Sequence, residues 1–458
     1  MRRQLFSHPV EAAVSAHLFH PDFKPEPYWW EAARPTIEGH RDLLAETDVL
    51  IVGSGYAGLA CALELQRGGR SATVAEANAF GEGASTRNGG AVSASLNLGK
   101  GLAGGASRKA TDMDEAEVRR FLGEGVAVLD LLESLIRREK IDCHYERSGR
   151  FSGAYARRHL DGMYATVEKL NKYAEAEAEV LPPARQREEI GSDFYHGGLL
   201  VRRAGKLHPA LYHNGVLAAC RRAGVRLSAN TEVLRIEGRK GAFAVTTSAG
   251  RTRAEEVVVA TNGYTGELTP ELRRRLIPVA SHIIATEELP EQLAKRLIPN
   301  GRTISDTPRI LHYYRLSPDG RRMIFGGRSR FTDVGPEVSA PLLHRAMTER
   351  FPELGEARIT HSWRGNVAFT FDHMPHMGVT GWGRQDGLYH CMGCNGSGIA
   401  MMTYLGHMTA RAILGGGNVD SAFAGRPFPT RPLYTGNPWF LPLVGAWFRF
   451  LDRRDRAA

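Results

Sequence analysis

Asp48-Val49-Leu50-Ile51-Val52-Gly53-Ser54-Gly55-Tyr56-Ala57-Gly58 is the stretch that decides the fold of this 458-residue chain. Residues 49–52 are a continuous apolar run, as expected of a strand buried on both faces of a parallel sheet. Three glycines follow with the spacing Gly-x-Gly-x-x-Gly, and residues 59–66 then have the pattern of a helix. A second short strand, residues 72–75, ends at Glu76. This order of strand, glycine turn, helix and strand predicts a Rossmann-like dinucleotide-binding unit.

Each part of this unit has a mechanical role. Gly53 permits a tight turn, Gly55 lets the backbone approach a pyrophosphate, and Gly58 allows close contact between helix and strand. The first amides of the helix would face the phosphates, and Glu76 would accept hydrogen bonds from the ribose hydroxyls. The residues expected to contact the dinucleotide here are Gly53, Gly55, Tyr56, Ala57, Gly58, Glu76 and Ala77.

The segment after Glu76 separates the candidate dinucleotides. Gly83-Ala84-Ser85-Thr86-Arg87-Asn88-Gly89-Gly90 is too rich in glycine and polar residues for the helix of a βαβ unit. Such a loop can run along a large cofactor and donate backbone and hydroxyl hydrogen bonds. The sequence therefore favours FAD over NAD.

The rest of the chain alternates helix and strand patterns, and its glycine signals lie far apart. We expect an α/β protein with an FAD-binding Rossmann-like domain and an interleaved mixed-sheet substrate domain. The expected division is an N-terminal arm at 1–46, FAD-binding segments at 47–100, 200–265 and 360–415, substrate-domain segments at 101–199 and 266–359, and a C-terminal tail at 416–458. Asp114 is the expected cap of a strong helix over residues 114–140.

Charge and composition exclude several classes of protein. The chain has 59 basic and 50 acidic residues, a formal net charge of +9. The basic residues are scattered as doublets such as Arg119-Arg120 rather than concentrated in one stretch, so we expect no nucleic-acid partner. Attraction for anionic ligands or lipid headgroups stays open.

Cysteine usage and hydropathy predict a soluble, cytoplasmic protein. Five cysteines are few for this length and do not indicate a disulfide framework. Cys391 and Cys394 form a CxxC without a second pair, so no metal site is expected. The sequence shows neither a signal-peptide pattern nor a run of about 18 apolar residues that could span a membrane.

Several motifs in a fixed order resemble the D-amino-acid-oxidase-like (DAO) family of FAD oxidoreductases, most closely the branch containing γ-glutamylputrescine oxidase. The resemblance covers nearly the whole chain. Besides the two glycine loops, it rests on Tyr28-Trp29-Trp30, Gly205-x-Leu207-His208-Pro209, the Ala-Thr-Asn-Gly end of a strand at 257–263, Trp363-x-Gly365, Gly393-x-x-Gly396-Ser397-Gly398 and Pro438-Trp439-Phe440.

The resemblance implies further cofactor contacts. A first group would line the diphosphate and flavin ring, a second the adenine and ADP, and a third the flavin and its oxygen side at a helix start. These groups are Ser85, Thr86, Asn88, Gly89 and Gly90; Val233, Ala260, Thr261 and Gly263; and Gly396, Ser397, Gly398 and Ile399. Gly365 and Gly393 are further expected cofactor contacts. The resemblance also implies Arg328 and Trp363 as the catalytic residues.

Two departures from the family pattern matter. Residues 363–372 lack the cysteine that tethers the flavin in some relatives, so we expect non-covalent FAD. Met401-Met402 stands where relatives that oxidise amino acids keep a lysine for the substrate carboxylate. We therefore expect an apolar surface near the amine nitrogen and poor use of small α-amino acids. Arginines such as Arg315 or Arg328 could meet a more distant carboxylate.

The expected reaction is oxidation of a small-molecule amine. Hydride would pass from the carbon next to the nitrogen to flavin N5, the imine would be hydrolysed by water, and O2 would reoxidise the flavin and yield hydrogen peroxide. Two alternatives stay open: a dehydrogenase that passes electrons to a quinone or another carrier, and a non-catalytic FAD-binding subunit.

The tail over residues 433–451 is aromatic and could lie on a membrane surface with Arg453, Arg454 and Arg456 meeting anionic lipid. Pro442 and Gly445 weaken a helix there, and the similar tail of the family favours packing on the protein body. We expect packing.

Overall fold

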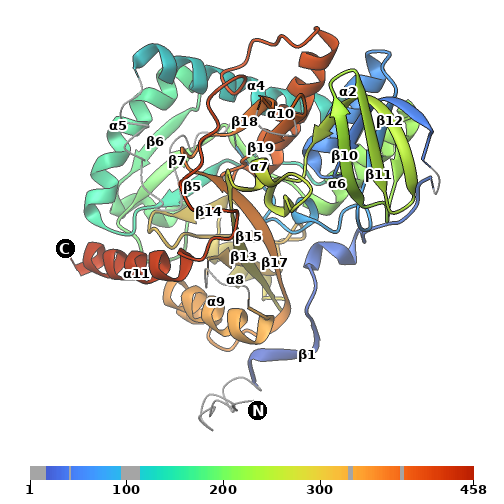
Figure 1. The fold of residues 1–458 in the computed structure, drawn as a ribbon. Coiled ribbons are helices and arrows are strands. Elements are labelled where there is room, and N and C mark those ends of the chain that lie inside the picture. The colour runs from blue at the N-terminus through green and yellow to red at the C-terminus, as the bar shows by residue number, and fades with distance from the viewer. Residues whose placement is uncertain (1–16, 41–42, 94–113, 329–333, 382–385, 458) are drawn as a thin grey trace.

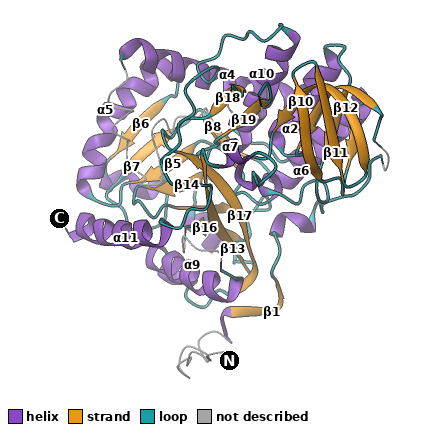
Figure 2. Ribbon diagram, viewed as in Figure 1, coloured by secondary structure: helices purple, strands orange, loops and turns teal. Residues whose placement is uncertain are grey.

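The computed structural model describes residues 17–40, 43–93, 114–328, 334–381 and 386–457. Two large sheets form the molecule, with helices packed around them (Figure 1 and Figure 2). A pair of short antiparallel strands, β4 (Ala91–Ser93) and β8 (Ala204–Lys206), lies apart from both sheets.

The first sheet carries the glycine-rich unit at its centre. Its main strand order is β10 (Val233–Arg239), β11 (Ala242–Thr247), β12 (Gly250–Val259), β2 (Glu46–Val52), β3 (Ala72–Ala75) and β9 (Arg226–Ser228). β12, β2, β3 and β9 run parallel to their neighbours in this central part. β19 (Tyr389–Met392) pairs with both β12 and β18 (His376–Val379).

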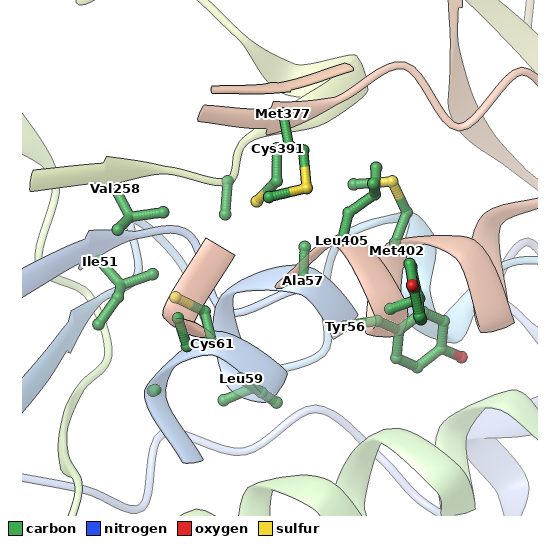
Figure 3. Close-up of a cluster of buried hydrophobic side chains, with 14 of the residues drawn as sticks. Ile51, Tyr56, Ala57, Leu59, Cys61, Val258, Met377, Cys391, Met402 and Leu405 are labelled. Carbon is green, nitrogen blue, oxygen red and sulfur yellow. The ribbon is translucent and has the colours of Figure 1, made fainter. Parts of the chain in front are cut away.

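Three helices pack near this sheet: α2 (Tyr56–Arg67), α6 (Pro209–Ala223) and α10 (Gly398–Leu414). Glycine lets two of these backbones approach closely. A Cβ on Gly58 would clash with the carbonyl oxygen of Gly53, and one on Gly406 would clash with that of Ala57. Ile51 and Leu405 are fully buried in the core between these elements (Figure 3).

The second sheet is mixed and has nine strands. Its order is β1 (Phe19–Lys24), β17 (Ile359–Thr370), β13 (Leu276–Thr286), β16 (Met323–Gly327), β15 (His312–Leu316), β14 (Thr303–Asp306), β5 (Arg150–Gly153), β7 (Gly198–Val201) and β6 (Ala178–Leu181). β1–β17 and β14–β5 are parallel pairs, and the remaining pairs are antiparallel. The remaining α-helices among the described residues are α4 (Glu115–Glu139), α5 (Arg157–Ala174), α7 (Pro270–Arg273), α8 (Glu291–Leu297), α9 (Pro336–Arg350) and α11 (Leu441–Ala457).

The α/β class with a second mixed sheet is confirmed. The expected cap of α4 is also present, because Asp114 Oδ1 accepts a hydrogen bond from the amide of Glu117 at 2.7 Å. Two details differ from expectation. The N-terminal arm contains a strand, β1, and β17 lies in the nine-stranded sheet although most of it falls in a segment expected for the FAD-binding domain. Its long antiparallel pairing with β13 explains that position. The division into domains stays a prediction.

A buried ion pair joins α9 to the nine-stranded sheet. Arg350 Nη2 lies 2.6 Å from Asp306 Oδ2, and neither side chain is more than 2% exposed. Burial raises the pKa of Asp306, but Arg350 and the hydrogen bond from His312 outweigh it and hold that pKa below its ordinary value. The pair therefore keeps its charge inside the core.

Candidate functional site

The glycine turn between β2 and α2 is shaped to approach a ligand. Gly53 has φ +101°, a conformation that favours glycine, and its amide donates to the carbonyl oxygen of Ala75 at 2.9 Å. Gly55 occupies the N-cap of α2 and so offers no side chain over the first turn of the helix. Helix N-termini of this kind bind phosphate through their amides and dipole.

Glu76 folds back over this turn from the end of β3. Its Oε2 accepts hydrogen bonds from Ser54 N at 2.9 Å and Ser54 Oγ at 2.7 Å, and its Oε1 accepts from Asn78 N at 3.1 Å. The carboxylate is thus held at the carboxyl ends of adjacent parallel strands, where nucleotides bind in α/β sheets. Ala77 is the exposed residue that follows.

Three tryptophans hold consecutive residues of the loop over 83–90. Trp30 Nε1 donates to Thr86 Oγ1 at 2.9 Å, Trp363 Nε1 to the Arg87 carbonyl at 2.8 Å, and Trp29 Nε1 to the Asn88 carbonyl at 2.8 Å. Trp29 and Trp30 come from a short 3-10 helix, Tyr28–Glu31, in the N-terminal arm, and Trp363 comes from β17. The loop is therefore fixed from outside by segments distant in sequence.

Hydrogen bonds within the loop over 83–90, and from the loop to α2, also fix its shape. Asn88 Nδ2 donates to the carbonyl of Ser85 at 2.9 Å, and Asn88 Oδ1 accepts from Gly90 N at 3.0 Å. The Tyr56 hydroxyl donates to the same Ser85 carbonyl, and Ser85 Oγ accepts from Tyr56 N at 3.2 Å. These bonds tie the loop to the first turn of α2, so the two glycine motifs form one surface.

A cavity of about 180 Å³ lies between this loop, the start of α10 and the nine-stranded sheet. Predicted residues on its wall are Asn88, Gly89, Gly90, Arg328, Gly365, Gly396, Ser397, Gly398 and Ile399. The sequence did not point to the other polar residues on its wall, which include Ser93, Arg150, Ser281, Thr303, Ser305, Tyr313, Asn366 and Asn395.

Tyr313 stands in the wall because two glycines make room for its ring. Its Cε2 lies 2.5 Å from where a Cβ on Gly326 would be and 2.9 Å from a Cβ on Gly89. The hydroxyls of Tyr313 and Ser281 lie 2.8 Å apart. Burial raises the pKa of Tyr313 to about 12, so the phenol stays protonated near neutral pH.

Two arginines add positive charge to the same wall. Arg150 Nη2 donates to Ser305 Oγ at 2.8 Å, and the Arg328 guanidinium lies over the ring of Phe369 at 4.6 Å. Burial lowers the pKa of each guanidinium to about 10. None of the described residues lining the cavity is Asp or Glu. The cavity therefore suits a ligand with an anionic group.

The start of α10 forms the opposite side of the cavity. Ser397 is its N-cap, and a Cβ added to Gly396 or Gly398 would meet no described atom within 4 Å. Open space beside a helix N-terminus lets a flat, partly anionic ring approach the backbone.

The remaining predicted cofactor residues lie outside the cavity. Ala260 and Thr261 follow β12 and lie beside Gly53, since a Cβ there would be 3.3 Å from the Ala260 carbonyl and 3.6 Å from the Thr261 methyl group. Val233 begins β10 and is 6% exposed. Gly263 packs against Asn366, and Gly393 N donates to Asn262 Oδ1 at 2.9 Å.

Trp363 does not line the cavity. Its ring is 4% exposed and packs edge-on against Trp29 with 6.4 Å between centroids. Its contact with Arg87 holds the loop in position, and the catalytic role expected for it stays a prediction.

The positions expected for Met401-Met402 and for Arg315, beside the substrate, are wrong. Met401 and Met402 are 0% and 5% exposed and belong to the core around α2 and α10, where Figure 3 labels Met402, whereas Ile399 and Ala400 line the cavity. Arg315 also lies outside the cavity wall, with its Nη1 donating to the Leu207 carbonyl at 2.8 Å.

These residues fit FAD. The start of α2, where Gly55 carries no side chain, lies beside Glu76 and suits the pyrophosphate and ribose, while the glycine loop and the start of α10 leave a space bounded by backbone for a planar ring. In the described part of the chain no group of three or more His, Cys, Asp and Glu could hold a metal ion. No helix among the described residues is both long and apolar enough to cross a membrane.

Comparisons with known proteins agree with FAD as the cofactor. The family model described as FAD dependent oxidoreductase (DAO) matches residues 48–412. γ-Glutamylputrescine oxidoreductase of Escherichia coli is 32% identical over 415 residues, which cover 89% of this chain and 93% of that protein. Probable oxidoreductase OrdL of Haemophilus influenzae is 29% identical over 418 residues, covering 90% of this chain and 93% of that protein. The crystal structure of glycine oxidase from Geobacillus kaustophilus superposes with a TM-score of 0.67 at 20% identity, covering 85% of this chain and 99% of that one.

Proposed function

The chain belongs to the DAO family of FAD-dependent oxidoreductases, and from this premise we propose that it oxidises a primary or secondary amine bearing a carboxylate remote from the nitrogen. The family assignment makes it an FAD enzyme that acts on the C–N bonds of amines or amino acids. A γ-glutamylated amine has the proposed chemistry, and the similarity to γ-glutamylputrescine oxidoreductase supports it.

The observation that carries the proposal is the composition of the cavity wall. Arg150 and Arg328 reach it from β5 and the end of β16, on the side of the nine-stranded sheet. The flavin-binding elements, the 83–90 loop and the start of α10, bound it from the other side. An anion near the guanidiniums would offset the cost of burying them, and the amine would then face the flavin side.

In the proposed mechanism the protein binds the cofactor and the substrate and orients them. When bound, FAD supplies the acceptor for a hydride that leaves the carbon next to the amine nitrogen. Asn88, Gly89 and Gly90 and the start of α10 would hold it against the cavity. Tyr313, protonated and fixed by Ser281, would donate a hydrogen bond to the substrate without removing a proton. The imine product is released for hydrolysis, and we take O2 as the oxidant that completes the cycle and forms hydrogen peroxide.

The experiment measures anaerobic reduction of the bound flavin, which is monitored as the decrease in flavin absorbance. We expect γ-glutamylputrescine to reduce the flavin with a second-order rate constant at least about tenfold above that of putrescine, which lacks a carboxylate. The same advantage should hold over sarcosine and glycine, whose carboxylates lie next to the nitrogen. Equal or faster reduction by those small α-amino acids would contradict the remote position of the carboxylate.

Two variants sharpen the experiment. Arg328→Met should lower the rate constant for γ-glutamylputrescine and leave that for putrescine unchanged, whereas Arg322→Met is the matched control because Arg322 binds the Thr286 carbonyl outside the cavity wall. Peroxide formation in air would support the oxidase, while turnover only with a quinone would support a dehydrogenase. If none of these amines bleaches the flavin, the proposed substrate class is wrong. A cytoplasmic location stays a prediction, which the five buried free thiols support.

A further inference from the structure

Helix α11 at the C-terminus is fixed to the molecule by one face. Leu441 and Phe448 enter a small apolar cluster with strands β13 and β17. Asp455 Oδ2 accepts a hydrogen bond from Arg309 Nη1 at 2.6 Å, and Asp452 Oδ1 accepts from the same nitrogen at 3.1 Å. The tail therefore packs on the protein body, as its sequence led us to expect, and its inner acidic groups are paired.

The opposite face of α11 is apolar and exposed. Leu443, Trp447 and Phe450 are 69%, 57% and 56% exposed, and their spacing of four and three residues places them on one helical stripe. We call these three residues the outer stripe. The rings of Trp447 and Phe450 stack with 5.5 Å between centroids, and Trp439, 68% exposed, precedes the helix. Apolar side chains gathered in this way on a monomer mark an interaction surface.

The outer stripe is bordered by positive charge. Arg449 lies beside it, and Arg453 and Arg454 continue its face toward the C-terminus; all three are exposed. The acidic residues of the same turns, Asp452 and Asp455, are buried and engaged by Arg309. The charge presented outward by this end of the helix is therefore basic.

We propose that α11 is an interfacial anchor that lies on an anionic phospholipid surface. The outer stripe would enter the boundary between headgroups and acyl chains, and Arg449, Arg453 and Arg454 would meet the lipid phosphates. Figure 1 shows α11 at the edge of the molecule beside the C-terminus. The charged inner face, held by Arg309, keeps the helix on the surface of a bilayer rather than across it.

Charge favours lipid over a second copy of this chain as the occupant. A two-fold contact centred on Phe450 would bring Arg449, Arg453 and Arg454 of one copy toward the same arginines of the other. Like charges held together in an interface cost free energy, whereas an anionic headgroup layer neutralises them. This inference concerns a surface apart from the cavity and does not depend on the identity of the substrate.

The test is co-sedimentation of the FAD-loaded enzyme with vesicles. We expect binding to vesicles of phosphatidylcholine mixed with phosphatidylglycerol and little binding to phosphatidylcholine alone. Binding to the mixed vesicles should weaken as the salt concentration rises.

The double variant Trp447→Glu with Phe450→Glu should lower the partition coefficient at least about tenfold, because two apolar anchors are lost. Arg453→Gln with Arg454→Gln should lower it and reduce the salt dependence. Leu234→Glu is the matched control, since Leu234 is an equally exposed apolar residue, at 54%, on strand β10.

The outcomes separate lipid from a second copy. Retention of FAD and an unchanged melting temperature show that each variant is folded. Equal sedimentation with both vesicle types, or full binding by the Trp447→Glu with Phe450→Glu variant, overturns the proposal. So does a dimer in vesicle-free buffer that dissociates in that variant, because the stripe would then be covered by protein.

Discussion

The indole N–H of Trp363 donates to the carbonyl oxygen of Arg87, 2.8 Å away, across 276 positions of sequence. This bond joins β17 of the nine-stranded sheet to the loop over residues 83–90, which bounds the cavity. On either side of Arg87, Trp30 donates to the Thr86 hydroxyl and Trp29 to the Asn88 carbonyl. We infer that the three indoles set the loop's shape before the cofactor arrives, which makes Trp363 a positioning residue.

Trp363→Phe should weaken FAD binding. The change keeps an aromatic ring and removes the N–H, leaving the Arg87 carbonyl without this donor at a cost of about 1 kcal/mol or more. The dissociation constant for FAD, measured by flavin fluorescence during reconstitution of the apoenzyme, should rise about fivefold or more. Trp439→Phe is the control, because Trp439 is 68% exposed. An unchanged dissociation constant together with a large loss of kcat at saturating FAD would instead give Trp363 a direct catalytic contact.

Gly58→Ala should disrupt the cofactor turn although alanine is the better helix former. A Cβ on Gly58 would clash with the Gly53 carbonyl oxygen, so either β2 or α2 must shift. We expect a lower melting temperature and reduced FAD content in the purified protein. Gly162→Ala in α5 is the matched control, since a Cβ there meets nothing within 4 Å. It should be neutral or stabilise by about 0.5–1 kcal/mol. Equal behaviour of the two variants would contradict the close packing of α2.

FAD should leave the protein on denaturation. All five cysteines are buried, and none lies on the described cavity wall. Acid precipitation should therefore release the yellow colour into the supernatant. A yellow pellet would show a covalent bond through another side chain.

The cofactor turn could be predicted because its information is local. β2, Gly53–Gly58 and Glu76 follow one another in sequence, and their structure depends on strand burial and backbone freedom within about thirty residues. The polar wall of the cavity has no such local pattern. Arg150, Ser281 and Tyr313 come from three strands that neighbour the cavity only after the nine-stranded sheet has formed. Arg150, an arginine inside the short strand β5, was the one available signal.

Met401-Met402 shows how alignment with a family motif can mislead. The position was inferred to face the substrate because relatives keep a lysine there. Each helical residue turns by about 100°, so side chains one or two positions apart face different surroundings. Here Ile399 and Ala400 line the cavity, while Met401 and Met402 pack in the core between α10 and its neighbours.

Asp306→Asn should destabilise the nine-stranded sheet in a pH-dependent manner. Removing one charge leaves Arg350 buried without its partner, at a cost of about 3 kcal/mol at neutral pH. The pKa of Asp306 is lowered in the folded protein, so its contribution is fully present above the ordinary carboxyl pKa and is lost as pH falls through the folded value. The difference in melting temperature between wild type and variant should be constant from about pH 6 to about pH 8 and shrink below about pH 4. Asp420→Asn, at a side chain that is 97% exposed, should change little. A difference that grows in acid would contradict the assignment.

Affinity for a dicarboxylate that carries no amine should depend on the charge of the two cavity arginines. Glutarate is the probe, because amine substrates lose their own proton in the same pH range. Burial lowers the pKa values of Arg150 and Arg328 to about 10, whereas that of Tyr313 is raised to about 12. A guanidinium is charged below its pKa. The affinity for glutarate, monitored by the change in the flavin spectrum, should therefore be constant below about pH 9 and weaken above about pH 10.

Arg328→Met should weaken glutarate binding at least about tenfold at neutral pH, because the remaining cation interacts alone with the carboxylate. Arg322→Met should keep both the affinity and the pH profile of the wild type. Binding that strengthens above about pH 10, or wild-type affinity in Arg328→Met, would show that the arginines do not bind the carboxylate. The anion would then bind elsewhere in the cavity.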